Sequence, residues 1–416
     1  MIHTQPKLSM FAETLERSTF LSLTLKLSLF ATLVITSLRS GAIHMITHDR
    51  FVNDYNAFYL AGKLALDGQI SLAYHFKEMD QALRQFYGGD VSMPWSYPPP
   101  FDLVVSLLAL FPIGASSFLF SGFALVFYFQ LTNLLAKEHR RLLAFILLPV
   151  LFLNLISGQN GLLTGSLLAS FCYLRLKDNP WAGIPLGLMI IKPHLALGFA
   201  LHVTCQRRGK TLWIAALTAA ILATVSTYAF GVGVWRDFAE GIQEATSFLK
   251  GGNYPLVRMT SVFAETYTLS GNPAFGQAAQ IISLLMASAG TIYITFLHIP
   301  ETQKLGLIGL LTPFFSPYFY DYDLPVVGVG LALLFPTLRN QLPPLCRLLA
   351  LTSFVLAESG WKIMSSLSQI TSTQETPLAV YIEHLPSLAS SFLLITFILI
   401  SKGVFDAWKA QSIPHD

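Results

Sequence analysis

Four long stretches of the chain contain no charged side chain. Residues 103–136, 142–174, 211–235 and 266–300 have no Asp, Glu, Lys or Arg. A helix needs about 20 apolar residues to cross roughly 30 Å of hydrocarbon, and each stretch is long enough. Helices also satisfy every backbone hydrogen bond inside lipid, and the alternating pattern of a membrane-spanning barrel is absent. The sequence therefore predicts an all-α, polytopic membrane protein.

The overall composition agrees with this prediction. Apolar residues make up 53% and charged residues 12% of the 416-residue chain, and about 25% charged residues is usual in soluble domains. The net charge of +3 indicates no nucleic-acid partner. Cys172, Cys205 and Cys346 lie in or beside apolar segments without metal-ligand spacing, so they are interpreted as small core residues.

Breaks at proline, glycine and polar residues divide the chain into about twelve helical segments, which predict one integral membrane domain with about 10–12 transmembrane helices. The first, 18–38, is too long for a signal peptide and is interpreted as an uncleaved span. Segments 100–112, 142–156 and 161–175 are short, so we expect them to be tilted, re-entrant or buried. The predicted segments are 18–38, 100–112, 115–136, 142–156, 161–175, 181–203, 211–234, 275–298, 305–319, 323–338, 345–364 and 386–402.

The topology follows from placing the N-terminus in the cytoplasm. The polar segments 39–99, 235–274 and 365–385 then face the extracytoplasmic side, and the tail 403–416 is cytoplasmic. The cationic turn 206–210 falls in the cytoplasm, as the positive-inside rule expects. The cationic clusters 137–141 and 175–177 would lie outside, so either an early segment does not cross or these cations serve a purpose there.

The first polar segment contains two candidate helices. Apolar side chains recur at helical spacing from Phe76 to Tyr87, opposite Lys77, Glu78 and Arg84. This pattern predicts an amphipathic helix in the membrane interface. A second short helix fits residues 55–66 and ends at Asp67-Gly68.

Asp54 is the candidate catalytic residue. It lies shortly after the first span, beside Tyr55 and further aromatic residues. A carboxylate at a membrane boundary can accept a proton from a hydroxyl nucleophile. Alternatively, Asp54 caps a helix that begins at Tyr55, because Asp is a favoured N-cap residue.

Three cation-forming residues are candidates for binding an anionic group such as phosphate. Lys192 and His194 flank Pro193, which interrupts an apolar segment, and Arg258 lies in the second polar segment. The alternatives are a lysine that snorkels to the interface beside a kink and an arginine on a solvated surface.

Three polar or aromatic motifs are candidates for contacting a sugar. Tyr97 precedes a rigid run of prolines, and the Ser157–Gly161 motif offers Gln159 and Asn160, either as a binding loop or as a tight turn between helices. The third motif combines the flat rings of Tyr320 and Tyr322 with Asp321 and Asp323. These tyrosines also suit an interfacial aromatic belt, and the two carboxylates suit a divalent metal.

Read in order, these motifs resemble the polytopic bacterial glycosyltransferase family 87, over residues 50 to 335. No single motif is specific, and the resemblance depends on the order of all six. They are Asp54-Tyr55 with Ala61-Gly62, Tyr97-Pro98-Pro99, Gly158-Gln159-Asn160, Lys192-Pro193-His194, Arg258 to Ser261-Val262-Phe263, and Ser316-Pro317 to Tyr322-Asp323.

The resemblance implies a GT-C-type helical bundle in a bacterial inner membrane, with its site at the extracytoplasmic face. It implies a polyprenyl-phosphate sugar donor, mannose or another hexose, and a lipid or lipid-linked glycan acceptor. Asp54 would be the base of an inverting transfer, with Lys192, His194 and Arg258 at the donor phosphate. Ser261 joins the other motif residues as a substrate contact. No metal would be required, although Asp321 and Asp323 allow one.

Two alternatives remain from the sequence. A transporter or flippase would use Lys192 and the acidic residues to line a path for a lipid-linked or anionic substrate. A noncatalytic membrane subunit would support a polysaccharide-assembly complex. The three long polar segments predicted on one side favour the enzyme.

Overall fold

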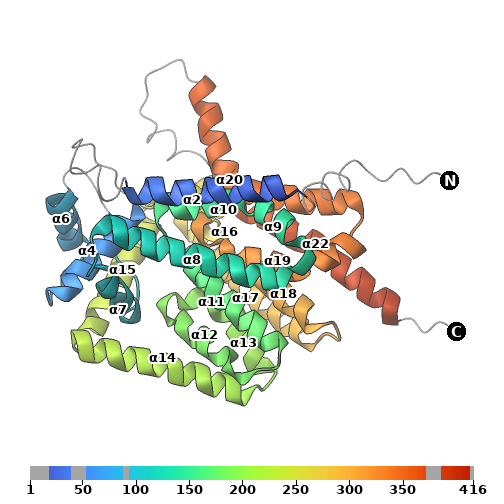
Figure 1. Ribbon diagram of the computed structural model, residues 1–416, viewed down its shortest axis with the longest axis horizontal. Helices are drawn as coiled ribbons and strands as arrows, with labels where there is room; N and C mark the ends of the chain where they lie inside the picture. Colours follow the sequence, from blue (N-terminus) through green and yellow to red (C-terminus); the bar gives the residue numbers. More distant parts are fainter. Residues whose placement is uncertain (1–17, 39–52, 88–92, 372–385, 413–416) are drawn as a thin grey trace.

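The computed structural model describes residues 18–38, 53–87, 93–371 and 386–412, and this part of the chain is helical without a sheet (Figure 1). The described α-helices are α2 (Thr19–Leu38), α4 (Asp54–Leu66), α5 (Ser71–Tyr74), α6 (Phe76–Tyr87), α7 (Pro99–Leu108), α8 (Ile113–Ala136), α9 (Arg140–Ile146), α10 (Leu148–Ser157), α11 (Gly161–Leu176), α12 (Gly183–Leu188), α13 (Leu197–Cys205), α14 (Gly209–Phe230), α15 (Val234–Lys250), α16 (Val262–Ser270), α17 (Pro273–Phe296), α18 (Glu301–Leu311), α19 (Pro325–Gln341), α20 (Pro344–Thr371) and α22 (Ala389–Ser412).

The prediction of an all-α, polytopic membrane protein is confirmed. Within the described residues, 6 helical segments are long and apolar enough to span a membrane, and 4 shorter apolar helices accompany them. α19 is the central helix, buried over almost its whole length, whereas α14 is exposed along most of its surface, as expected of a helix that faces lipid.

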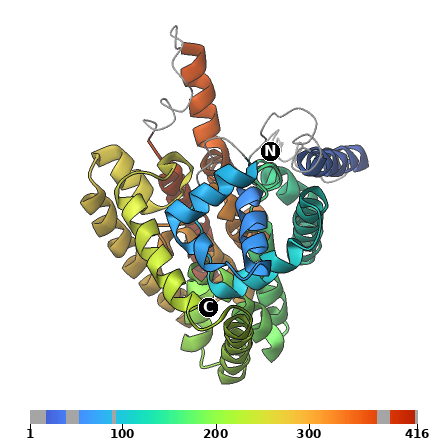
Figure 2. The same cartoon turned by 90° about the vertical axis from the view of Figure 1, so that its left-hand side faces the viewer.

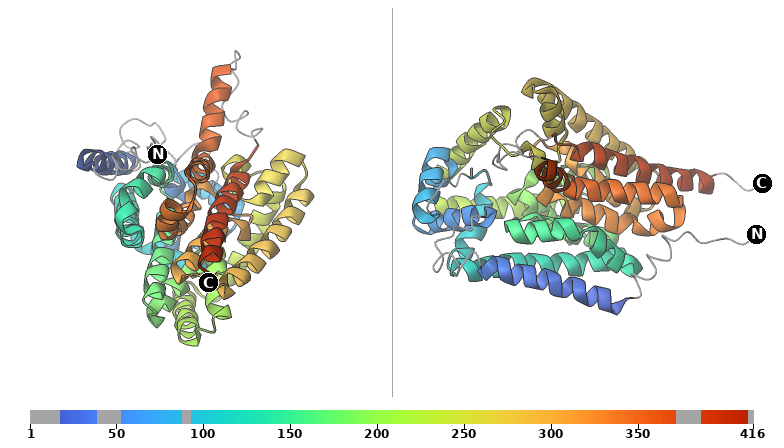
Figure 3. Two further views of the ribbon diagram at one scale, coloured as in Figure 1. Left: turned by 90° about the vertical axis from the view of Figure 1, so that its right-hand side faces the viewer. Right: turned by 90° about the horizontal axis from the view of Figure 1, so that it is seen from above.

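Most of the long helices run between two ends of the molecule. Helices α4, α6, α7 and α15 gather at one end, on the left in Figure 1 and towards the viewer in Figure 2. We call this the site end. The start of α2 and the end of α22 lie at the other end, which we call the base end (Figures 1 and 3).

The short helix α7 explains why the predicted topology put the cationic clusters 137–141 and 175–177 on the extracytoplasmic side. At about 1.5 Å per residue its 10 residues extend roughly 15 Å, too little to cross a bilayer. α7 stays at the site end, where Asp102 accepts hydrogen bonds from Tyr74 Oη (2.6 Å) and Trp95 Nε1 (3.0 Å). This agrees with the expectation that segment 100–112 is too short to cross alone, and with the alternative that an early segment does not cross. α8 alone returns the chain to the base end.

The predicted segment 181–203, which Pro193 interrupts, is not one crossing helix but a helical hairpin. Its first arm contains α12 and the 3₁₀ turn Met189–Ile191, and its second arm contains α13. The tip is Lys192-Pro193, where the proline lacks the amide hydrogen of a continuous helix. At the base end, Asp178 precedes the first arm and Arg208 follows the second, and an ion pair of 3.0 Å joins these two side chains.

Two glycines let the first arm of the hairpin pack closely against α14. A Cβ atom at Gly183 would lie 2.3 Å from the carbonyl oxygen of Thr211, and one at Gly187 would lie 2.4 Å from that of Ala215. Such small residues, spaced four apart, allow helix backbones to approach one another in membranes. This contact fixes the hairpin whose tip carries Lys192.

The polar segments contain more helix than the sequence indicated. The predicted helices at 55–66 and 76–87 are confirmed as α4 and α6, and Gly68 adopts a left-handed conformation (φ 70°) beyond α4. The segment 235–274 holds α15 and α16 instead of an extended loop. Of 365–385, α20 continues to Thr371 and residues 372–385 lie outside the described part, and the predicted tail begins within α22.

Candidate active site

A cavity of about 770 Å³ opens at the site end, within the range of about 300–1,000 Å³ that is usual for ligand sites. It lies between α4, the hairpin tip, α15 and the segment before α19. Most of the predicted site residues line it: Asp54, Tyr97, Gln159, Lys192, His194, Arg258, Tyr320 and Tyr322.

Asp54 presents its carboxylate to this cavity from the first turn of α4. The N-cap of α4 is Asn53, and no side-chain cap hydrogen bond is present, so the alternative that Asp54 caps the helix is wrong. Burial raises the pKa of Asp54 above its usual value, and the positive charge of Arg258 is the strongest opposing influence. A partly buried carboxylate with a raised pKa is suited to accept a proton.

The turn between α10 and α11 supplies the partner of Asp54. Gln159 Nε2 donates a hydrogen bond of 3.0 Å to Asp54 Oδ2, and Tyr97 Oη donates one of 3.3 Å to Gln159 Oε1. The motif is therefore a tight turn between helices, and because Gln159 also lines the cavity, a contact with a sugar stays a prediction. The turn packs so closely that a Cβ at Gly161 would lie 1.6 Å from the carbonyl oxygen of Tyr322.

Lys192 is held by a buried carboxylate. Its Nζ lies 2.5 Å from Asp323 Oδ1 and donates a longer hydrogen bond of 3.4 Å to Asn160 Oδ1. The Lys192 side chain is 8% exposed and that of Asp323 is 0% exposed, so the alternative of a snorkelling lysine is wrong. Asn160 also lies behind the cavity wall, fully buried.

Arg258 is held in the same way by Asp321. Its Nε and Nη2 each lie 3.2 Å from one oxygen of the Asp321 carboxylate, a bidentate pair. An antiparallel bridge between Met259 and Tyr320, with a hydrogen bond of 2.8 Å from Thr260 N to Phe319 O, brings the two segments together. The alternative of a solvated surface arginine is wrong, because the side chain is 22% exposed.

The ring of Tyr322 lies beside both cations. Lys192 Nζ is 4.8 Å and Arg258 Cζ is 5.7 Å from its centroid, within the range of about 6 Å for cation–π contacts. Tyr320 stacks on Tyr322 with centroids 5.0 Å apart and an interplanar angle of 7°. The pair forms a flat aromatic wall next to the positive charges.

Some predicted site residues support the site from behind. Tyr55 is fully buried and its hydroxyl hydrogen-bonds Ser116 of α8, away from the cavity. Ser261 is buried as the N-cap of α16, where its hydroxyl accepts a hydrogen bond of 3.3 Å from Ala264 N. His194 does line the cavity, and its Nε2 is buried without a hydrogen-bond partner among the described residues. His194 therefore contributes to the cavity wall, and its role in binding an anion stays a prediction.

One wall of the cavity was not anticipated from the sequence. α15 contributes Phe238, Ile242, Ala245 and Phe248, which share one helix face. Phe248 packs against Phe76 of α6 with ring centroids 4.4 Å apart. The spacing of these four residues was a readable signal, since apolar residues three or four apart mark one face of a helix.

Two groups of side chains are relevant to metal binding. Asp321 and Asp323 are the predicted pair, and each already contacts a cation of the site. His75, Asp237 and Glu240, from α15 and the segment before α6, place ligand atoms within 4.8 Å of one another. Arg236 Nε lies 4.0 Å from Asp237 Oδ1 and 3.8 Å from Glu240 Oε1, so a metal ion would compete with Arg236 for both carboxylates.

The cavity therefore combines a proton acceptor, two fixed cations and an aromatic wall. A carboxylate that accepts a proton and cations that stabilise a developing negative charge are the requirements for transferring a group from a phosphate to a hydroxyl.

We expect Asp323→Asn to destabilise the protein by about 3–5 kcal/mol, because it leaves the Lys192 charge buried without its carboxylate. The matched control is Glu240→Gln, which removes a carboxylate 3.8 Å from the exposed Arg236 and should cost about 1 kcal/mol or less. Thermal unfolding of the purified variants in detergent measures both. Equal stability of the two variants would contradict a stabilising role for the buried pair.

The sequence model of glycosyltransferase family 87 matches residues 95–317, more than half of the chain. This range includes Tyr97, Gln159, Lys192 and Arg258, whereas Asp54 lies before it, so the assignment of Asp54 depends on geometry. No curated protein and no solved structure matches the chain. Family membership favours an enzyme over the transporter and the noncatalytic subunit. The cavity and the family match lead to one conclusion: the chain belongs to glycosyltransferase family 87 and is a membrane glycosyltransferase.

Proposed function

We propose that this glycosyltransferase transfers a sugar, mannose or another hexose, from a polyprenyl-phosphate donor to a hydroxyl of a lipid or lipid-linked glycan. The observation that carries the proposal is the presence of Asp54, Lys192 and Arg258 in one cavity, with both cations fixed by buried carboxylates.

In the proposed reaction, the acceptor hydroxyl oxygen attacks the anomeric carbon and forms the new glycosidic bond. The bond between that carbon and the phosphate oxygen breaks, and its electron pair stays on the phosphate. The hydroxyl proton passes to the Asp54 carboxylate. Attack from the side opposite the leaving phosphate inverts the anomeric centre.

Lys192 and Arg258 favour the transition state over the bound donor. A phosphodiester carries one negative charge, and the departing phosphate monoester gains a second. Fixed cations interact more strongly with the group as this charge develops, and their carboxylate partners hold them in place before the reaction. We propose that His194, which lines the same cavity, contacts the phosphate as well.

The remaining walls suit the other parts of the substrates. The stacked rings of Tyr320 and Tyr322 offer a flat surface for a sugar. The apolar face of α15 and Phe76 of α6 form a hydrophobic side of the cavity, which is compatible with an isoprenoid chain and with an acceptor that arrives from the bilayer.

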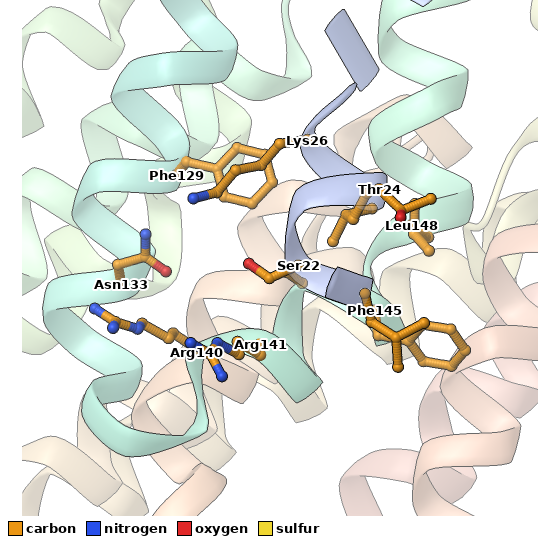
Figure 4. Close-up of a pocket in the computed structure, with 12 residues that line it drawn as sticks. Ser22, Thr24, Lys26, Phe129, Asn133, Arg140, Arg141, Phe145 and Leu148 are labelled. Carbon is orange, nitrogen blue, oxygen red and sulfur yellow. The ribbon is translucent and has the colours of Figure 1, made fainter. Parts of the chain in front are cut away.

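We propose that the site faces the periplasm or cell exterior of a bacterial inner membrane. The cationic segments 137–141, 175–177 and 206–210 gather at the base end: Arg140 and Arg141 line a pocket with the start of α2 (Figure 4), and Arg175 bonds Gln206 (2.7 Å). The positive-inside rule then places the base end in the cytoplasm and the cavity outside.

We expect Asp54→Asn to lower the rate of transfer by about 10²–10⁴-fold, the usual contribution of a general base. Asn keeps an oxygen for the Gln159 hydrogen bond but accepts no proton. Mass spectrometry of lipids from cells lacking the protein, complemented with each variant, detects a glycolipid heavier by one sugar. Asp67→Asn, an exposed aspartate at the other end of α4, is the control and should match wild type. Wild-type product levels with Asp54→Asn would exclude Asp54 as the base.

The pH dependence of transfer should reflect the effect of Arg258 on the pKa of Asp54. A base works only when ionised, so kcat/KM is lost as the pH falls through its pKa. Arg258 lowers the pKa of Asp54 against the effect of burial, and Arg258→Gln should therefore move the acidic limb of the profile to higher pH. Arg236→Gln, which removes a side chain that is 80% exposed, should leave it in place. An acidic limb that stays or moves to lower pH in Arg258→Gln would contradict this arrangement.

We propose further that transfer requires no metal, because Asp321 and Asp323 serve as partners of Arg258 and Lys192. Enzyme treated with EDTA should keep its full rate, and added Mg²⁺ should not increase it. Loss of transfer in EDTA with recovery in Mg²⁺ would assign the two carboxylates to a metal instead.

A further inference from the structure

The side-chain amide of Gln159 has a fixed orientation. Its oxygen Oε1 faces two donors, Tyr97 Oη at 3.3 Å and the backbone nitrogen of Asn160 at 3.4 Å. A backbone N–H group can only donate a hydrogen bond, so the atom that it faces is the amide oxygen. The amide nitrogen Nε2 therefore points the other way, where it donates a hydrogen bond of 3.0 Å to Asp54 Oδ2.

The turn that carries this amide is fixed to the start of α4. Asn53 Nδ2 donates a hydrogen bond of 3.4 Å to the carbonyl oxygen of Ile156. Gly158 has a left-handed conformation (φ 67°), and a Cβ atom there would lie 2.6 Å from Tyr55 Cβ. The residues on both sides of Asp54 thus contact the α10–α11 turn, so the turn and the Asp54 backbone are held at a constant separation.

The ring of Tyr97 is anchored on the same helix as Asp54. It packs against Phe58 of α4, with ring centroids 5.4 Å apart, and against Phe101 of α7 at 4.6 Å. Asp54, Gln159 and Tyr97 therefore form a chain of hydrogen bonds that begins and ends at α4. Such a chain restricts the rotation of each side chain in it.

The chain holds one oxygen of the Asp54 carboxylate and leaves the other available. Oδ2 accepts the Gln159 hydrogen bond, whereas Oδ1 has no partner among the described residues. A general base must lie within hydrogen-bond reach of the proton that it accepts, and a displacement of about 1 Å can lower a rate by about 10²-fold. A side chain that fixes the carboxylate is therefore of value to the transfer.

We propose that Gln159 is a positioning residue, which holds Asp54 Oδ2 so that Oδ1 faces the acceptor hydroxyl and receives its proton. Tyr97 keeps the Gln159 amide in the required orientation. This inference rests on the proposed function, in which Asp54 is the base. It gives Gln159 a role through Asp54, in place of the sugar contact that the sequence predicted.

The test compares Gln159→Leu in two backgrounds, wild type and Asp54→Asn. Each purified full-length protein in detergent is mixed with a lipid extract of cells that lack the protein, and mass spectrometry follows the glycolipid that is heavier by one sugar. We expect Gln159→Leu to lower the rate by about 10–10²-fold in the wild-type background. In Asp54→Asn it should lower the remaining rate by less than about threefold, because no base is left to position.

The pH profile provides a second readout. Burial raises the pKa of Asp54, and the hydrogen bond from Gln159 opposes this increase, as does the charge of Arg258. Gln159→Leu should therefore move the acidic limb of the profile to higher pH. Tyr97→Phe, which keeps the ring, should move it in the same direction by less. The control Gln243→Leu changes an exposed residue of α15 and should leave the rate and the limb unchanged.

The outcomes separate this inference from the proposed function. A wild-type rate in Gln159→Leu, or equal losses in both backgrounds with an unmoved acidic limb, would overturn the positioning role, and equal losses would favour the sugar contact. A wild-type rate in Asp54→Asn would overturn the base itself. If Gln159→Leu does not fold, Tyr97→Phe in the two backgrounds makes the same comparison, and equal losses there would also contradict the proposal.

Discussion

The candidate active site depends on two buried ion pairs that share one short segment. Asp321 and Asp323 belong to the single 3₁₀ turn before α19, and they hold Arg258 and Lys192 from two distant parts of the chain. A buried charge without a partner costs several kcal/mol, so each cation is confined to the position where its carboxylate lies. The turn thereby sets the distance between the two positive charges.

The rest of the bundle serves to bring these segments to the turn. The hairpin reaches it because Gly183 and Gly187 allow its first arm to lie against α14, and because Pro193 ends the helix at the tip. The α10–α11 turn reaches it because Gly161 has no side chain to meet Tyr322. Close packing and one helix break therefore position charges that lie far apart in the sequence.

The long helices, and the candidate residues that meet in one cavity, were more predictable from the sequence than the connections between helices. Charge-free stretches identify α8, α14 and α17 because these helices face lipid on much of their surface. The hairpin was missed because an apolar segment with a proline looks the same whether the chain continues or turns back. The partner of Asp54 was also not predictable, since Gln159 is brought to it by the packing of α10 and α11 and not by local spacing. α15 was missed because its polar face dominates the composition of 235–274.

The proposed reaction keeps the total charge beside the two cations constant. Before transfer, Asp54 and the donor phosphate each carry one negative charge. Afterwards Asp54 is neutral and the phosphate carries both, so negative charge moves towards Lys192 and Arg258 without leaving the cavity. Burial already raises the pKa of Asp54, and in the proposed reaction the negative charge of a bound donor would oppose the ionised form of Asp54 further. The donor itself thereby strengthens the base that activates the acceptor.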